Sequence, residues 1–118
     1  MEAECRDGPV VYIASAFSGD VLGNTKKTIE YSRFAVKQGA YPINPILNLL
    51  GVLDEASDRE RAMKIDLTLL GRADELWVFG IPTAGMKEEM AEAKKCGIRI
   101  RYFKDKDGRM ASPGGGSL

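Results

Sequence analysis

The feature that most constrains the fold is a set of short apolar runs, separated by segments with helical periodicity. The runs PVVYIAS (residues 9–15) and ELWVFG (residues 75–80) are rich in β-branched and aromatic residues and show no alternation with polar residues. Strands with this pattern are buried on both faces, as in parallel sheets that helices cover on each side. The chain is therefore predicted to be an α/β protein.

Further strands and the helices between them predict the topology. Two more strands are expected at residues 41–44 and 98–103. Helical segments are expected at residues 24–38, 46–55 (a helix or a partly helical lid), 57–72 and 85–95. Right-handed crossovers then give a Rossmann-like three-layer sandwich, with four or five mainly parallel strands in the order 2-1-3-4.

Helix-start signals refine two of these segments. Asn24 or Thr25 is expected to cap the first helix, because both side chains accept hydrogen bonds from backbone N–H groups. Ser57 and Glu60 have the spacing of a capping box at the third.

One domain accounts for most of the 118 residues. We expect a polar N-terminal stub at residues 1–8, the folded domain at residues 9–104 and a flexible, glycine-rich tail at residues 105–118. The first residues lack the apolar centre of a signal peptide, and no apolar run approaches the length of a membrane span. The sequence therefore predicts a cytoplasmic protein with no membrane partner.

Charge and composition exclude several kinds of site. Seventeen basic residues balance seventeen acidic ones, which argues against a nucleic-acid polymer as the partner. The chain has no histidine and two distant cysteines, so neither a metal site nor a cofactor is expected. Any general acid or base must be a carboxylate, tyrosine, lysine or cysteine.

The predicted strand order places a ligand crevice between the first and third strands, at their carboxyl ends. Two loops converge there, at residues 16–23 and 80–85. In the second, Thr83 and Gly85 precede a helix, whose first N–H groups favour a phosphate or a sugar oxygen. A simple turn with a threonine cap explains the same residues. The first loop has neither a GxGxxG nor a Walker pattern and is a weak phosphate signal.

Two acidic residues interrupt apolar helix stripes. Asp66 lies four residues after Ala62 and three before Leu69, and Glu89 lies three after Met86 and four before Ala93. Burial of a lone carboxylate is costly. Each acid either caps a loop or pairs with a basic residue, or the two line a pocket as nucleophile and acid or hydroxyl clamp.

Several motifs resemble known enzymes. The segments VYIAS, QGAYPINP, DLTLLGRADELWVFG and TAGMKEEMAEAKKCGI resemble a bacterial and phage family of uncharacterised small domains. That family in turn resembles the nucleoside 2-deoxyribosyltransferases and the deoxynucleoside 5′-monophosphate N-glycosidases. The resemblance covers residues 10–103 and implies an N-glycosidic bond hydrolase or transferase that acts on deoxynucleosides or their 5′-monophosphates.

The resemblance also assigns roles to residues. Glu89, four residues after Gly85, matches the glutamate that attacks the anomeric carbon, and Asp66, eight before Asp74, matches the site aspartate. Tyr12 matches an aromatic hydroxyl in the first strand; from its pattern alone it is equally a core tyrosine. The expected substrate-binding residues are Ser15, Ser18, Gly19, Asn24, Thr83, Gly85 and Met86.

Relatives of this kind complete their sites across a dimer interface, so a homodimer or higher homo-oligomer is expected. Two other hypotheses remain: a non-catalytic module that binds a nucleotide-derived small molecule, and a structural partner of phage or mobile-element proteins.

Overall fold

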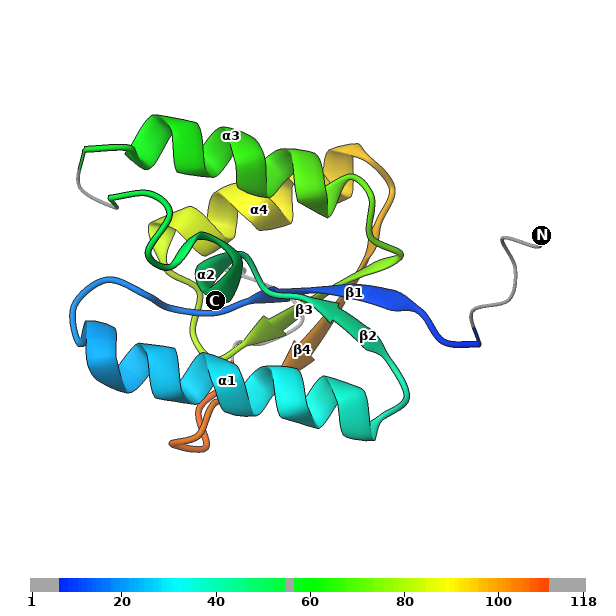
Figure 1. Ribbon diagram of the computed structural model, residues 1–118. Coiled ribbons are helices and arrows are strands. Elements are labelled where there is room, and N and C mark those ends of the chain that lie inside the picture. The colour runs from blue at the N-terminus through cyan, green and yellow to red at the C-terminus, as the bar shows by residue number, and fades with distance from the viewer. Residues whose placement is uncertain (1–6, 55–56, 111–118) are drawn as a thin grey trace.

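The computed structural model describes residues 7–54 and 57–110, which form a parallel sheet covered by helices (Figure 1). The strands are β1 (Val10–Ala14), β2 (Tyr41–Ile43), β3 (Glu75–Phe79) and β4 (Arg99–Phe103). Their order is β2-β1-β3-β4, and all neighbouring pairs are parallel. The predicted α/β class, parallel sheet and 2-1-3-4 order are thus confirmed.

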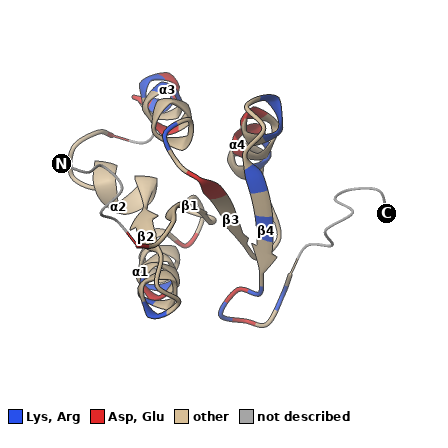
Figure 2. Ribbon diagram, turned by 90° about the vertical axis from the view of Figure 1, so that its right-hand side faces the viewer, with Lys and Arg blue, Asp and Glu red and all other residues tan. Residues whose placement is uncertain are grey.

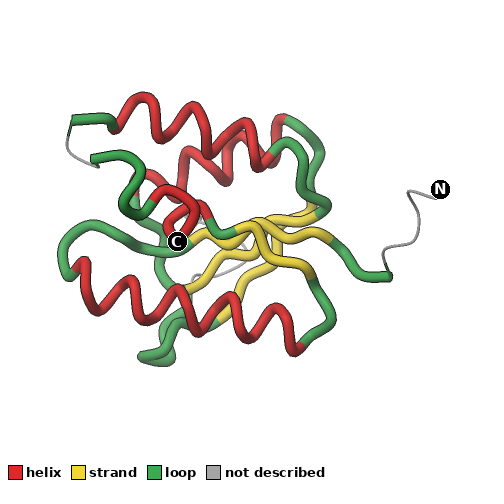
Figure 3. Tube along the Cα trace, viewed as in Figure 1, coloured by secondary structure: helices red, strands yellow, loops and turns green. Residues whose placement is uncertain are grey.

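Helices cover both faces of this sheet. They are α1 (Val21–Lys37), α2 (Pro45–Leu49), α3 (Arg59–Leu70) and α4 (Ala84–Lys95). Helix α1 lies on one face, and α3 and α4 lie on the other, so the molecule is a Rossmann-like three-layer sandwich (Figure 2). The loops after β1 and β3 lie at the same end of the sheet (Figure 3).

The alternation of side chains along the buried strands produces two cores. Tyr12 of β1 packs with Leu76 and Val78 of β3 beneath α3 and α4. Val11 and Ile13, on the opposite side of β1, pack in the core with α1. Both faces of the central strands are buried, as their continuous apolar sequence predicts.

The predicted cap of α1 is wrong. The helix begins at Val21, and the carboxylate of Asp20 accepts a hydrogen bond from the N–H of Gly23 at 3.1 Å. Asn24 therefore lies within the first turn of the helix. Because Asp20 is itself a strong N-cap residue and lies four residues earlier, it starts the helix first.

The capping box predicted at Ser57 is also wrong. Helix α3 begins at Arg59, and Asp58 at its N-cap makes no side-chain capping bond. Instead, the Asp58 carboxylate accepts from the N–H of Asp54 at 3.0 Å, and Asp54 accepts from the N–H of Ser57 at 3.3 Å. These carboxylates organise the turn before α3, which removes the need for a serine cap.

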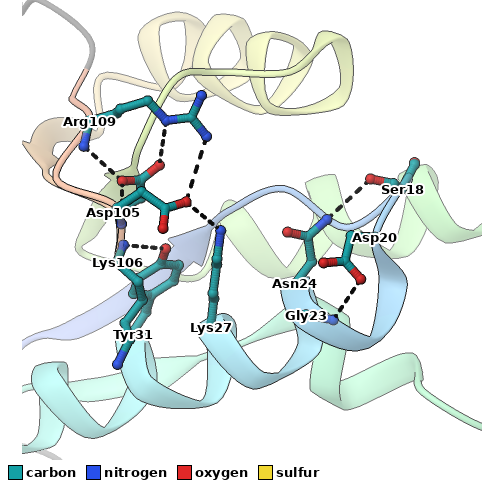
Figure 4. A network of polar contacts seen from close by, with 10 residues as sticks. Ser18, Asp20, Gly23, Asn24, Lys27, Tyr31, Asp105, Lys106 and Arg109 are labelled. Atoms are coloured by element: carbon teal, nitrogen blue, oxygen red, sulfur yellow. Dashed lines mark hydrogen bonds and ion pairs between the residues drawn. The ribbon is translucent and has the colours of Figure 1, made fainter.

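The first residues of the expected tail form a turn that contacts α1 (Figure 4). Lys27 pairs with Asp107 at 2.8 Å, and the N–H of Lys106 donates to the Tyr31 hydroxyl at 3.2 Å. Asp105 closes the turn by accepting from the N–H of Arg109 at 2.7 Å. Residues 111–118 of the tail and residues 1–6 of the stub lie outside the described residues.

None of the helices in residues 7–54 and 57–110 combines the length and the apolar character that a membrane span requires.

Candidate functional site

A pocket of about 400 Å³ opens at the carboxyl ends of the strands. Its walls come from the loop after β1, from α2 and the turn that follows it, from one face of α3 and from the start of α4. Both loops expected at the switch point therefore contribute, through Phe17 and Ser18 in one and Thr83 in the other. This is the position where open parallel sheets bind ligands.

Glu89 lies in the wall of this pocket and is nearly buried. Its side chain is on the stripe of α4 that also carries Met86, Met90 and Ala93, and only 6% of the residue is exposed. The hydroxyl of Tyr12, which is fully buried in β1, donates to Glu89 Oε2 at 2.6 Å. Tyr12 does not line the pocket and instead holds the carboxylate from behind.

Asp66 lines the same pocket from α3, so the structure brings together both acids that interrupt the apolar stripes. Burial raises the pKa of Glu89 from 4.5 to about 7; the Tyr12 hydrogen bond opposes this, and the charge of Asp66 adds to it. The pKa of Tyr12 is also raised, by burial and by the charges of Glu89 and Asp66, so its hydroxyl remains a donor. At neutral pH both the protonated and the ionised form of the Glu89 carboxyl are therefore populated.

The predicted binding residues divide into two groups. Those that line the pocket are Ser15, Ser18, Thr83, Gly85 and Met86. Gly19 and Asn24 do not belong to the lining. The Asn24 amide donates to the carbonyl of Ser18 at 3.1 Å (Figure 4). It also donates to the carbonyl of Phe17 at 3.0 Å, so Asn24 fixes the shape of the loop.

The start of α4 combines a cap with open space. Thr83 is the N-cap, and its hydroxyl accepts from the N–H of Met86 at 3.3 Å, as the simple-turn interpretation expects. At Gly85 a Cβ would meet Met63 Cε at 3.7 Å, an ordinary contact distance. The absence of a side chain at Gly85 is therefore not required for packing and leaves room in the pocket.

One wall is apolar. The predicted lid is a short helix followed by a turn, and the wall residues that it contributes are Pro45, Ile46, Leu49, Leu50 and Leu53. Phe17 faces the same pocket from the loop after β1. A wall of this chemistry suits the face of a planar ring in a ligand.

The sequence analysis missed Arg59 and Met63, which line the pocket from α3. With Ala62 and Asp66 they have the spacing i, i+3, i+4 and i+7, which places all four on one helix face. Their helical spacing from Asp66 is the sequence signal that could have identified Arg59 and Met63 as pocket residues. Within residues 7–54 and 57–110, no group of three or more acidic or cysteine side chains could hold a metal ion.

Comparison with known proteins identifies the family. The model of a family described as "Domain of unknown function (DUF7768)" matches residues 9–103. The chain belongs to the DUF7768 family. No curated protein matches this DUF7768 chain.

The fold of this DUF7768 member is similar to a solved 2-deoxyribosyltransferase from the bacterium Bacillus psychrosaccharolyticus. The TM-score is 0.62 at 21% sequence identity, over 77% of this chain and 69% of the enzyme. At that identity the similarity concerns the fold.

Proposed function

We propose that this protein cleaves the N-glycosidic bond of a deoxynucleoside or its 5′-monophosphate, with Glu89 as the nucleophile. The observation that carries the proposal is the nearly buried Glu89 in the wall of a pocket that also contains Asp66, with the Tyr12 hydroxyl bonded to it from behind. The fold shared with a 2-deoxyribosyltransferase supports it.

The proposed reaction has two steps. The ionised carboxylate of Glu89 attacks C1′ of the sugar while the bond from C1′ to the base nitrogen breaks, and that bond's electrons leave with the base. Asp66 either supplies the proton that the departing base takes up or holds a sugar hydroxyl. Water, or a second base, then attacks C1′ and releases Glu89, which gives hydrolysis or transfer respectively.

The electrostatics of Glu89 are suited to this role. Its pKa of about 7 leaves a large fraction ionised at neutral pH, yet the carboxylate is poorly solvated and hence reactive. The Tyr12 hydroxyl stabilises the ionised form of Glu89 by donating to Oε2. Oε1 is then the oxygen that remains to attack C1′.

We also propose that the protein forms a homo-oligomer through the rim of the pocket. Leu50 and Val52, in the turn after α2, are 51% and 68% exposed beside the apolar wall. Sedimentation of the wild type and of Val52→Asp tests this: a monomeric wild type would contradict it.

The test of the activity is release of free base. The protein is incubated with the four deoxynucleosides and their 5′-monophosphates, with and without an acceptor base, and the products are separated by chromatography. Glu89→Gln should release no base, whereas Glu88→Gln, which alters the exposed neighbour on α4, should retain activity. Base exchange would identify a transferase.

Absence of base release from every substrate would refute the catalytic proposal. A tight complex with an intact nucleotide would then support the binding-module alternative. Glu89 is nearly buried and its pKa is raised, which is compatible with recognition of a ribose hydroxyl without attack.

A further inference from the structure

A polar network links the start of α2 to the pocket. Asn44 caps α2, since its Oδ1 accepts from the N–H of Leu47 at 3.3 Å. Its Nδ2 lies 3.2 Å from the carbonyl of Thr28 and 3.0 Å from the Thr28 hydroxyl. A backbone N–H donates and a carbonyl accepts, so these two backbone partners fix the amide orientation. Nδ2 shares its two protons among three acceptors, the third being Ser32 Oγ at 2.8 Å, and it cannot accept a proton from the Thr28 hydroxyl.

The direction of the next hydrogen bond follows from the inability of Nδ2 to accept a proton. Thr28 is fully buried, and its hydroxyl has one proton that needs an acceptor. Asn44 Nδ2 is a donor and cannot take that proton. Among the described residues, the oxygen that hydrogen-bonds to this hydroxyl is Ser15 Oγ, at 2.7 Å. Thr28 therefore donates to Ser15.

Ser15 lines the pocket, and its own proton is left for a ligand. We propose that Ser15 is an obligatory hydrogen-bond donor to the ligand and binds a phosphate oxygen of a deoxynucleoside 5′-monophosphate. The direction of the Thr28–Ser15 hydrogen bond does not depend on the proposed function, whereas the choice of ligand rests on it. Asn44 and Thr28 are positioning residues that act through Ser15.

The chemistry of the pocket favours a phosphate over a free 5′-hydroxyl at this position. A free 5′-hydroxyl can either donate or accept, so a fixed donor at Ser15 gives a ligand with that hydroxyl little advantage in binding. The ionised oxygens of a phosphate accept only, and hydrogen bonds to them are roughly twice as strong as those between neutral groups. Arg59 contributes a positive charge to the same lining, while Asp66 and Glu89 provide acceptors that suit the sugar hydroxyls.

The experiment compares ligand affinities in a background that does not consume the ligand. Titration calorimetry on Glu89→Gln measures the affinity for the four deoxynucleoside 5′-monophosphates and for the four matching deoxynucleosides. Adding Ser15→Ala should weaken monophosphate binding by about 10- to 100-fold, the effect of losing a hydrogen bond to a charged group. Nucleoside binding should change less than about threefold.

Asn44→Asp tests the positioning chain without altering the pocket lining. A carboxylate at residue 44 still caps α2 but can only accept, so the Thr28 proton turns toward it and Ser15 must donate to Thr28. Selectivity for the monophosphate should fall as it does in Ser15→Ala. Ser32→Ala is the matched control, because Ser32 also accepts from Asn44 at 2.8 Å but lies outside the chain to Ser15. It should leave selectivity unchanged.

Two results would overturn the proposal. One is an unchanged preference for monophosphate in Ser15→Ala, or no binding of any monophosphate. The other is a neutron structure of the deuterated wild type in which the Ser15 deuterium points at Thr28. This measurement decides the direction of the Ser15–Thr28 hydrogen bond even if Asn44→Asp does not fold. Base release by the wild type, together with an unchanged preference, would refute this inference and leave the proposed function intact.

Discussion

Glu89→Gln should stabilise the protein at alkaline pH. Because burial raises the pKa of Glu89 from 4.5 to about 7, the folded protein binds this proton more tightly than the unfolded chain does. The stability that comes from the protonated carboxyl is complete below about pH 4.5 and is lost as the pH rises through 7. Glutamine stays neutral at every pH, and its amide oxygen can accept the Tyr12 hydrogen bond.

The magnitude follows from the two pKa values. A tenfold difference in ionisation constant corresponds to about 1.4 kcal/mol, so ionising Glu89 costs the fold about 3 kcal/mol at pH 8 and about 1 kcal/mol at pH 5. The free energy of unfolding of Glu89→Gln relative to wild type should therefore rise by about 2 kcal/mol between these pH values.

Urea denaturation from pH 5 to pH 8.5 measures this difference. The exposed neighbour provides the control, because Glu88→Gln removes only the smallest of the contributions that raise the pKa of Glu89 and should change the curve far less than Glu89→Gln does. Parallel curves for wild type and Glu89→Gln would refute the argument, since they would mean that Glu89 ionises in the fold as it does in water.

Three further substitutions test other parts of the structure. Tyr12→Phe removes the donor that lowers the pKa of Glu89, so the pH at half-maximal base release should move upward by about one unit; an unchanged profile would contradict this. Gly85→Ala should keep or raise the melting temperature, because alanine favours helix. It should weaken substrate binding by roughly tenfold, because the methyl group enters the pocket; equal affinity by calorimetry would count against the proposed location of the substrate. Gly80→Ala should destabilise by about 1–3 kcal/mol in urea, because residue 80 has a φ of 82° and a Cβ there would lie 2.9 Å from Asp105 Cβ; a loss below half a kcal/mol would contradict this.

The parts of the site that the sequence predicts are those with a periodic signature. Asp66 and Glu89 stand out because each is a charge at a position where α3 or α4 requires an apolar residue, and both line the pocket. Their assigned roles in catalysis stay predictions. The strand order follows from the alternation of buried strands with helices, and it is confirmed.

The features that sequence analysis missed depend on contacts between distant segments. Ser15 was expected in the site, but its link to Thr28 and Asn44 was not, because these residues lie just after β1, in α1 and just after β2, and their hydroxyl and amide groups carry no periodic pattern. The start of α1 was missed although Asp20 is a strong N-cap residue, because Val21 and Leu22 are 45% and 68% exposed and break the amphipathic pattern where the helix begins. Local patterns cannot report the network, since tertiary contacts decide it, whereas the cap at Asp20 is a local signal.

The turn formed by residues 105–110 has a consequence for fragment design. The change in composition at Lys104 and the family match ending at residue 103 both suggest a convenient point of truncation. A polypeptide cut there would lose the partners of Lys27 and Tyr31 and would uncover the backbone at Gly80. Expression and crystallisation of this domain should therefore retain the chain through Met110.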